Sequence, residues 1–474
     1  MKSKLFPIGH YVITFLLIFG FGFLPPFGQM SAYGMGVLGT FIGAIYGWTT
    51  IGMIWPSLMA LCGLGMYVDM GSMLQSSFGN PAVAALFPLF PMMALLSELH
   101  ITEYVANKFF TNRLSLGRPW VAIFILFLGA FVCASVNSIL VIIIFAVFVV
   151  DLCKNLGIAP YSKLPSTLLL GLSYAIMNGQ IIFPFLGTGL TFTAAYGSMF
   201  QTTLPFAQYM LFIIPMGIVM LLVYVLIMRF VFRVDVSPLA NMTEEMLGEK
   251  AVMTRDQKLV SIFFVAYILI MTISSLLPKA WLIAIVLNTM TIFGVSVLIT
   301  GLLMLIKNSS GQPLLDFALM AAKGMAWEPI LLTAYIMAIS AFLTTAETGF
   351  GATLSALLAP TTALPPLLFV LAIMLFATIV TNVANNLILT IIIMPIISSF
   401  AGQVGLNAVG LILMLFVTTQ MALATPGASP ITGIVFSQTS MVKAGDLSKY
   451  ALMAIPILFV FCMLFGYVYM NIIF

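Results

Sequence analysis

The sequence has 474 residues, of which 62% are hydrophobic and only 6% are charged, with a formal net charge of +4. A soluble globular domain carries about 25% charged residues, so this composition excludes a chain that folds in water around one core. Most of its surface is expected to face lipid, which predicts an all-α integral membrane protein. The cysteines show no paired spacing, so neither a disulfide framework nor a metal centre is predicted.

Apolar stretches of about 20 residues, the length of one membrane crossing, recur along the chain. They cover 9–28, 33–50, 53–72, 82–100, 204–232, 259–277, 281–306, 327–345 and 448–473. Three further apolar regions, 119–151, 164–200 and 363–437, are too long for one span and contain Gly, Pro, Asn and Thr in mid-run. Such interruptions are tolerated at membrane depth only where backbone is buried in protein or lines a cavity.

The basic residues indicate how these segments are oriented. If 119–151 and 365–400 are hairpins that each enter and leave on one side, and the N-terminus is cytoplasmic, every Lys and Arg except Lys279 is cytoplasmic. The positive-inside rule therefore favours two re-entrant hairpins on opposite faces and an external C-terminus. This bias also explains the net charge without an acidic or nucleic-acid partner.

A polar cytoplasmic linker, 233–258, divides the chain into two similar halves. Scaffold spans are expected at 1–118 and 259–360. The first transport half is 119–232, with hairpin 119–151, broken helix 164–200 and span 204–232; the second is 361–474, with hairpin 363–400, broken helix 404–437 and span 448–473. The result is about eleven spans plus two opposed hairpins, an inverted two-fold repeat of the kind typical of secondary transporters.

Four polar clusters interrupt the apolar regions, at 133–138, 178–191, 381–386 and 418–430. A hairpin tip begins one helix, whose free N–H groups suit an anion, and ends another, whose carbonyl oxygens suit a hard cation such as sodium. A single polar residue, such as Ser173 or Thr378, is explained by packing between helices. Clusters at matching places in both halves instead favour a binding site, and no basic residue lies near any of them.

Acidic residues fall mainly at predicted span ends. Glu98, Asp151 and Asp446 do so, and Glu328 and Glu347 bracket one span, where either a proton site or a helix-end position accounts for them. The paired acids and nucleophile–base sets of an intramembrane enzyme are absent from the sequence, so no catalytic activity is expected.

The polar clusters resemble those of the divalent anion/sodium symporters, which carry dicarboxylates, tricarboxylates or sulfate. In that family a Ser-Asn-Thr motif at each hairpin tip is followed by a proline. The stretch 381–387 with Pro395 resembles the second copy, and Val136-Asn137-Ser138 resembles the first. The remaining similarities are Gly187-Thr188 and Ala424-Thr425-Pro426 at the two helix breaks, and Trp48-Thr49-Thr50 with Pro56 near the start.

The resemblance implies an elevator-type transporter, in which hairpins and broken helices move against a dimeric scaffold. It implies that substrate contacts come from Asn137, Ser138, Thr188, Gly189, Asn385, Asn386, Thr425 and Pro426. It also implies two sodium sites, one with Asn137 and Gly187, the other with Thr381, Ala384, Asn386 and Ala424. Val136 and Leu387 depart from the family motif, where Ser and Thr are usual.

The expected function is secondary transport of a small anion, a di- or tricarboxylate, across the plasma (inner) membrane, coupled to sodium or by exchange. Two alternatives stay open. One is a sodium/proton or metalloid transporter of the same superfamily, which a midplane Asp or Glu would favour. The other is an uncoupled channel or membrane sensor, which saturable uptake that follows a sodium gradient would exclude.

Overall fold

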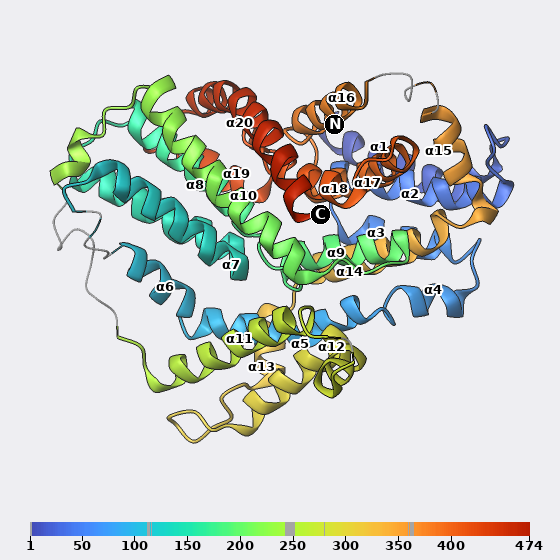
Figure 1. Cartoon of the computed structure of the whole chain (residues 1–474), viewed down its shortest axis with the longest axis horizontal. Coiled ribbons are helices and arrows are strands. Elements are labelled where there is room, and N and C mark those ends of the chain that lie inside the picture. Colours follow the sequence, from blue (N-terminus) through green and yellow to red (C-terminus); the bar gives the residue numbers. More distant parts are fainter. Residues whose placement is uncertain are drawn as a thin grey trace.

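The computed structural model describes residues 2–110, 114, 116–241, 252–278, 280–358, 360 and 365–474. This part of the chain forms helices and no strand, as the composition predicted, with one isolated β-bridge between Lys307 and Pro313 (Figure 1). Seven described helices are long and apolar enough to cross a membrane, or eight if one bent pair counts as a span. The sequence predicted about eleven spans, and broken helices account for part of the difference because their segments are short.

The N-terminal region forms α1 (Lys2–Gly20), η1 (Phe21–Phe23), α2 (Ala32–Thr50), α3 (Ile54–Leu64), α4 (Met70–Ser76), α5 (Pro81–Glu98) and α6 (Ile101–Phe110). The prediction of one span at 53–72 is wrong, because α3 ends at Leu64 and α4 begins anew after Asp69. The Asp69 carboxylate accepts the backbone N–H of Ser72 at 2.9 Å, which caps the new helix.

The first transport half contains α7 (Pro119–Asn155), α8 (Lys163–Gly179), α9 (Gly187–Phe200) and α10 (Phe206–Leu226), which continues as a π-turn over Ile227–Val231. Helix α7 is broken at Asn137, whose φ of −149° is not helical. Its first arm runs alongside α8, since Phe127 lies against Gly171 and Phe131 against Gly179. A straight helix of 37 residues would be about 55 Å long and would carry Asn155 too far from Lys163, so the second arm folds back.

The second transport half repeats this order with α16 (Pro366–Val380), α17 (Asn386–Val404), α18 (Ala408–Thr418), α19 (Pro430–Phe436) and α20 (Ala444–Ile473). The rings of Phe369 and Phe400 stack at 3.7 Å between centroids, so α16 and α17 form an antiparallel hairpin with its tip at 381–385. Helices α10 and α20, which close the two halves, pack against each other.

Between the halves lie η4 (Ser237–Asn241), α11 (Arg255–Ser274), α12 (Leu282–Leu305), α13 (Phe317–Gly324), α14 (Trp327–Leu343), η6 (Ala346–Thr348) and α15 (Phe350–Leu358). The predicted linker 233–258 ends earlier than expected, because α11 begins at Arg255. A capping box between Thr254 and Gln257 starts this helix. Its middle, 242–251, lies outside the described residues. Helices α13 and α14 meet at an angle of 84°.

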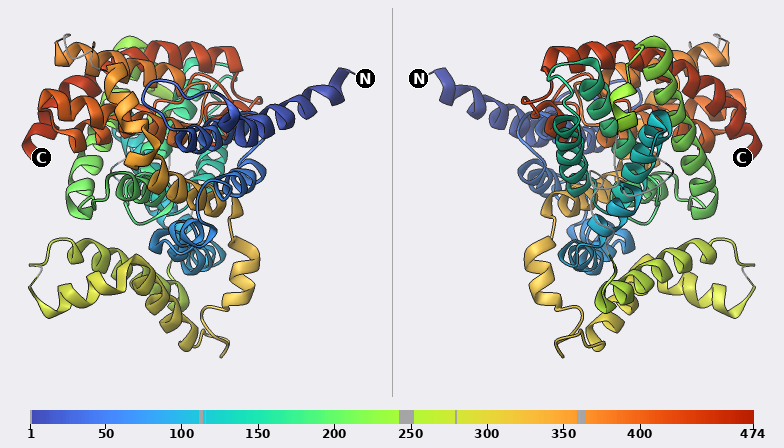
Figure 2. Two further views of the ribbon diagram at one scale, coloured as in Figure 1. Left: turned by 90° about the vertical axis from the view of Figure 1, so that its right-hand side faces the viewer. Right: turned by 90° about the vertical axis from the view of Figure 1, so that its left-hand side faces the viewer.

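The buried side chains form two apolar clusters. The larger joins α1–α3 and α14 to both transport halves, and the smaller joins α5, α11, α12 and α13 to the start of α9. Figure 2 shows α11 and α12 projecting away from the rest of the molecule. Only 22% of the apolar window of each is buried inside the chain, so both helices leave apolar faces for lipid or another protein.

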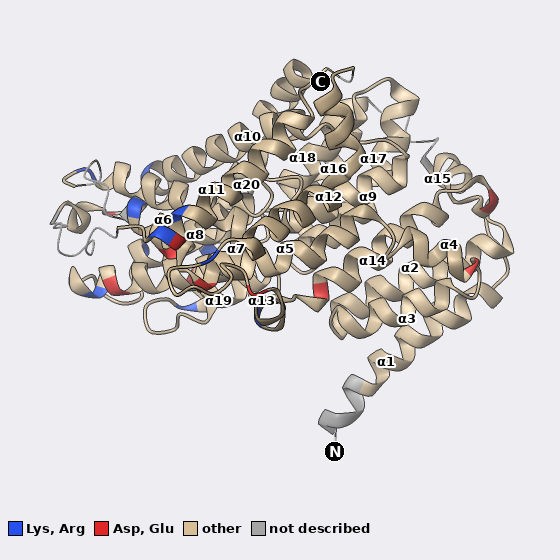
Figure 3. Ribbon diagram, turned by 90° about the horizontal axis from the view of Figure 1, so that it is seen from below, with Lys and Arg blue, Asp and Glu red and all other residues tan. Residues whose placement is uncertain are grey.

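Charged residues are separated along the molecule. In Figure 3 the described Lys and Arg positions gather toward α6, α8, α13 and α19, whereas the charged segments beside α4 and α15 are acidic. Those two segments contain Asp69 and Glu347. The orientation was predicted from the basic residues alone, and it stays a prediction. Arg113, Lys250 and Lys279, which also entered that prediction, lie outside the described residues.

Candidate functional site

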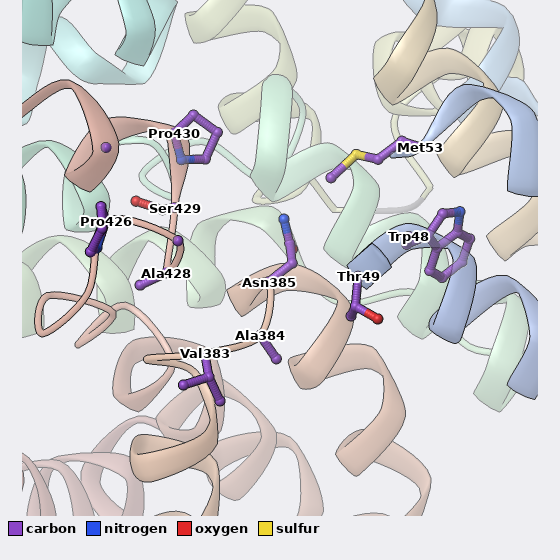
Figure 4. Close-up of a pocket in the computed structure, with 12 residues that line it drawn as sticks. Trp48, Thr49, Met53, Val383, Ala384, Asn385, Pro426, Ala428, Ser429 and Pro430 are labelled. Carbon is purple, nitrogen blue, oxygen red and sulfur yellow. The ribbon is translucent and has the colours of Figure 1, made fainter. Parts of the chain in front are cut away.

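A cavity of about 270 Å³ lies where the end of α2 faces the second hairpin tip and the second helix break (Figure 4). Trp48, Thr49 and Met53 form one wall. The opposite wall consists of Val383, Ala384 and Asn385 from the tip, and of Pro426, Gly427, Ala428, Ser429, Pro430 and Gly433 from the break and α19. None of these lining residues carries a charge, so any ligand here is held by neutral groups.

The α2 wall is fixed by hydrogen bonds within the scaffold. The Trp48 indole N–H donates to the Ser57 hydroxyl at 2.9 Å, and the indole ring packs edge-on against Tyr335 at 5.8 Å. The Tyr335 hydroxyl in turn donates to Thr40 at 3.0 Å. These bonds and the ring contact tie Trp48 to α3 and α14, so this side of the cavity is held by helices outside the hairpin.

Asn385 places an amide donor in the cavity. Its Oδ1 accepts the backbone N–H groups of Leu387 and Ile388, at 3.1 and 3.2 Å, and so caps α17. The capping bonds fix which end of the amide is oxygen, and Nδ2 makes no hydrogen bond in the described structure. In Figure 4 this nitrogen points toward the space between Pro430 and Met53. The prediction that free helix N–H groups at this tip would meet an anion is therefore modified, because Asn385 already accepts two of them.

The second tip and the second break are clamped together. Asn382 Oδ1 accepts the N–H groups of Leu423 and Ala424 at 2.9 and 2.8 Å, and the Thr425 hydroxyl donates to the Asn382 carbonyl at 2.5 Å. The Thr381 hydroxyl donates to the Thr419 carbonyl at 2.7 Å. These contacts hold Thr381 and Ala424, two of the predicted sodium ligands, at the junction of the tip and the break. The Ala424 carbonyl also accepts the Ser448 hydroxyl at 2.7 Å.

Asn386, next to Asn385, faces away from the cavity. Its Nδ2 donates to Gln420 Oε1 at 2.9 Å, and its Oδ1 accepts the Leu387 N–H at 3.0 Å. Gln180 Nε2, from the first break, donates to the same Gln420 oxygen at 3.2 Å. The two helix breaks, which are 240 residues apart in sequence, therefore meet at Gln420.

The predicted residues of the first half are less closely joined. Asn137 Oδ1 caps the second arm of α7 by accepting the Leu140 N–H at 3.0 Å, and Ser138 follows it. Gly187, Thr188 and Gly189 form the first turn of α9, which has no side-chain cap. Glycine is required at 187 by a φ of +49° and at 189 because a Cβ would lie 2.1 Å from the Phe183 carbonyl oxygen. No hydrogen bond joins Asn137 to this turn in the described part of the chain.

Of the predicted contacts, Ala384, Asn385 and Pro426 line the cavity, while Asn137, Ser138, Thr188, Gly189, Asn386 and Thr425 do not. Met53 and Ser429 line it although neither was predicted. Asn382 and Gln420 lay in the polar clusters, but nothing in the sequence distinguished them from their neighbours. Trp48 and Thr49 were signalled only by their resemblance to an early family motif.

The comparisons with known proteins agree with this architecture. Residues 187–474 match a family described as the sodium:sulfate symporter transmembrane region. Among solved structures, the chain is similar to the Alcanivorax borkumensis YdaH transporter, described as having an unusual topology, with 12% identity and a TM-score of 0.56. That alignment covers 87% of this chain and 89% of the other, and at this identity it shows likeness of fold alone. No curated protein matches the sequence. Because the family match spans more than half of the chain, this protein belongs to the sodium:sulfate symporter family of membrane transporters.

Proposed function

We propose that this protein is a secondary active transporter that moves a small anion, a di- or tricarboxylate, across the plasma membrane with sodium or by exchange. The observation that carries the proposal is the cavity between the second hairpin tip, the second break and the end of α2. A ligand held by the tip and the break at this position is covered by a scaffold helix on one side and can leave that helix when the two parts move.

The lining of the cavity suits a carboxylate. Asn385 Nδ2 is a hydrogen-bond donor without a partner in the described part of the chain, whereas the Thr49 hydroxyl already donates to the Tyr46 carbonyl within α2. Neutral donors bind an anion without the tight charge pairing that would slow its release. Contacts from Thr188 and Gly189, which do not line this cavity, are proposed on the resemblance alone.

Sodium is the proposed co-transported cation, held at the second tip by Thr381, Ala384, Asn386 and Ala424. The support is the clamp through Asn382, which keeps the tip and the break together while adding no charge of its own. The first-half site, with Asn137 and Gly187, is proposed on the resemblance alone. A proton exchanger would require an acidic residue at the cavity, and none of the described lining residues is acidic.

The proposed movement is an elevator, with both hairpins and broken helices travelling along a homodimeric scaffold. The described hydrogen bonds between the two parts join neutral groups, among them Thr191 of α9 with Thr333 of α14 at 3.0 Å and Ser399 of α17 with Ser355 of α15 at 3.2 Å. The apolar faces of α11 and α12 support contact with a second protomer. The N-terminus is proposed to be cytoplasmic and the C-terminus external.

Asn385→Asp tests the assignment of the cavity. Aspartate also caps helices, so α17 should still form, but the donor facing the ligand becomes a negative charge. Two like charges roughly 4 Å apart repel by about 4 kcal/mol at an effective dielectric constant of about 20. Sodium-driven uptake of labelled succinate, citrate and sulfate into proteoliposomes should therefore fall more than roughly a hundredfold for whichever anion the parent protein carries.

Asn407→Asp is the matched control, because Asn407 caps α18 through the Gly410 N–H and does not line the cavity. It should transport normally, and both variants should have the thermal stability of the parent protein. Unchanged uptake by Asn385→Asp would exclude this cavity as the anion site. A parent protein that takes up none of these anions would contradict the proposed substrate class.

A further inference from the structure

We infer that Gln420 is a positioning residue that orients Asn386 for sodium and links the second hairpin tip to the first helix break. The inference rests on the proposed function, because it concerns the sodium site assigned there. It adds a residue outside the predicted ligand sets, and it assigns a role to the contact between the two halves.

The direction of each hydrogen bond around Gln420 follows from one backbone group. The Leu387 N–H can only donate, so the Asn386 atom that it meets at 3.0 Å is the oxygen Oδ1. Asn386 therefore turns its Nδ2 to Gln420, and the Gln420 atom that accepts it at 2.9 Å is Oε1. Gln420 Nε2 then donates to the Phe416 carbonyl at 2.9 Å, and Gln180 is left to donate its own Nε2 at 3.2 Å.

This polarity matters for a cation. With Nδ2 held by Gln420, Asn386 keeps Oδ1 on its other side, where the second lone pair remains for sodium. Without Gln420, only the Leu387 N–H would hold Oδ1, and since Asn385 Oδ1 also accepts that N–H, the Asn386 amide would be free to rotate and to turn its NH₂ group toward the ion. Gln420 is fully buried and Asn386 is 6% exposed, so water cannot substitute for the missing partner.

The same oxygen of Gln420 connects the two halves of the protein. Gln180 is the C-cap of α8, and Gln420 directly follows the C-cap of α18, so the two glutamines occupy matching places in the two broken helices. Any shift of Asn386 that moves Gln420 also changes the bond to Gln180. Sodium bound at the second tip thus acts on the first break, and a change at Gln180 acts on sodium affinity without touching the ion.

Sodium binding to purified protein tests this inference without any substrate. Thermal unfolding is measured over a range of sodium chloride concentrations, and choline chloride keeps the ionic strength constant. An ion that binds the folded state raises the stability of that state. Gln420→Leu should raise the half-saturating sodium concentration about tenfold, the ratio expected for one lost buried hydrogen bond. Gln180→Leu should raise it as well, and the double variant should be no worse than Gln420→Leu alone.

Gln420→Glu is the conservative variant, since burial favours the neutral carboxyl, whose carbonyl oxygen accepts both amide donors while its hydroxyl donates to the Phe416 carbonyl in place of Nε2. It should keep the sodium response of the parent protein, which a loss of packing alone would not explain. Gln403→Leu, at an exposed position of α17, is the matched control and should leave sodium affinity unchanged.

The outcomes separate the inference from the proposed function. Parent-like sodium affinity in Gln180→Leu, or additive effects in the double variant, would overturn the inference even if Gln420→Leu fails to fold. If the two glutamine variants weaken sodium binding as expected but the parent protein takes up no anion, the proposed substrate is wrong and the inference stands. A parent protein that sodium does not stabilise would overturn both the sodium site and the inference.

Discussion

At the scale of single residues, asparagine side chains carry the chemistry of the helix breaks. Asn137 and Asn385 each use Oδ1 to cap a new helix, and Asn385 thereby presents its nitrogen to the cavity. The neighbouring Asn386 faces Gln420 instead. The sequence predicted that both residues would contact substrate. Two adjacent asparagines at a tip cannot be told apart in sequence, because the direction of each side chain depends on the backbone conformation of the turn.

Asn386→Ala should reduce both uptake and stability. The substitution leaves Gln420 Oε1 without its shortest hydrogen bond and removes one predicted sodium ligand. Losing a buried hydrogen bond of this kind costs about 1–3 kcal/mol, which should appear as a lower midpoint of thermal unfolding.

The control for this substitution is Asn471→Ala. Asn471 is exposed near the end of α20, where its amide donates only to the Tyr467 carbonyl. It should behave like the parent protein in both assays. Normal transport by Asn386→Ala would contradict a role for Asn386 in binding.

At the scale of helices, the breaks were predictable and several boundaries were not. Gly187, Pro426 and Pro430 interrupt apolar runs, and the structure has breaks at 180–186 and 419–429, between the segments of the two broken helices. The division of 53–72 into α3 and α4 depends on local capping by Asp69, which an apolar run obscures. The break in α12 falls at Thr291, with φ +57°, three residues before the nearest glycine, Gly294.

The cavity itself was only partly predictable. Its tip and break walls come from one continuous polar region, and the sequence located them. The wall that faces them comes from the end of α2 and from Met53, more than 300 residues earlier in the chain. No local sequence pattern predicts a contact between segments so far apart. Met53 in particular looks like any apolar residue of a membrane helix.

A disulfide between α9 and α14 should stop transport. The hydroxyls of Thr191 and Thr333 lie 3.0 Å apart, so cysteines at both positions are close enough to cross-link. In the proposed elevator this bond would join the moving part to the scaffold. Uptake by Thr191→Cys/Thr333→Cys should be lost on oxidation and restored by a reductant.

The comparison variant joins two helices of the moving part. Ser173 of α8 and Thr432 of α19 have hydroxyls 3.4 Å apart, and a disulfide there should leave movement possible. Both double variants require a background without Cys62, the one exposed cysteine. Full uptake by the oxidised Thr191→Cys/Thr333→Cys protein would rule out sliding at this contact.

At the scale of the whole molecule, the described charged residues are unevenly distributed. Lys and Arg gather at one side, and the acidic Asp69 and Glu347 lie in the segments beside α4 and α15 on the other (Figure 3). The positive-inside rule depends on loop composition and requires no knowledge of packing, so the orientation with a cytoplasmic N-terminus stays a prediction from the sequence.

Cysteine labelling in intact cells tests the orientation. In a Cys62→Ser background, Glu347→Cys should react with a membrane-impermeant thiol reagent added outside. Lys449→Cys, at an exposed position near the start of α20, should react only after the membrane is permeabilised. The reverse pattern would invert the topology, and equal labelling of both from outside would contradict it.

The two-sided cavity has a consequence for pharmacology. A ligand that contacts only Asn385 and the second break can travel with the hairpin, whereas a larger one that also presses against Trp48 and Met53 binds both parts at once. Such a molecule would prevent the two parts from moving and hold the protein in a single conformation. Within one chemical series, smaller compounds would then be transported and larger ones would inhibit. The position of Trp48 would determine the size at which a compound becomes an inhibitor.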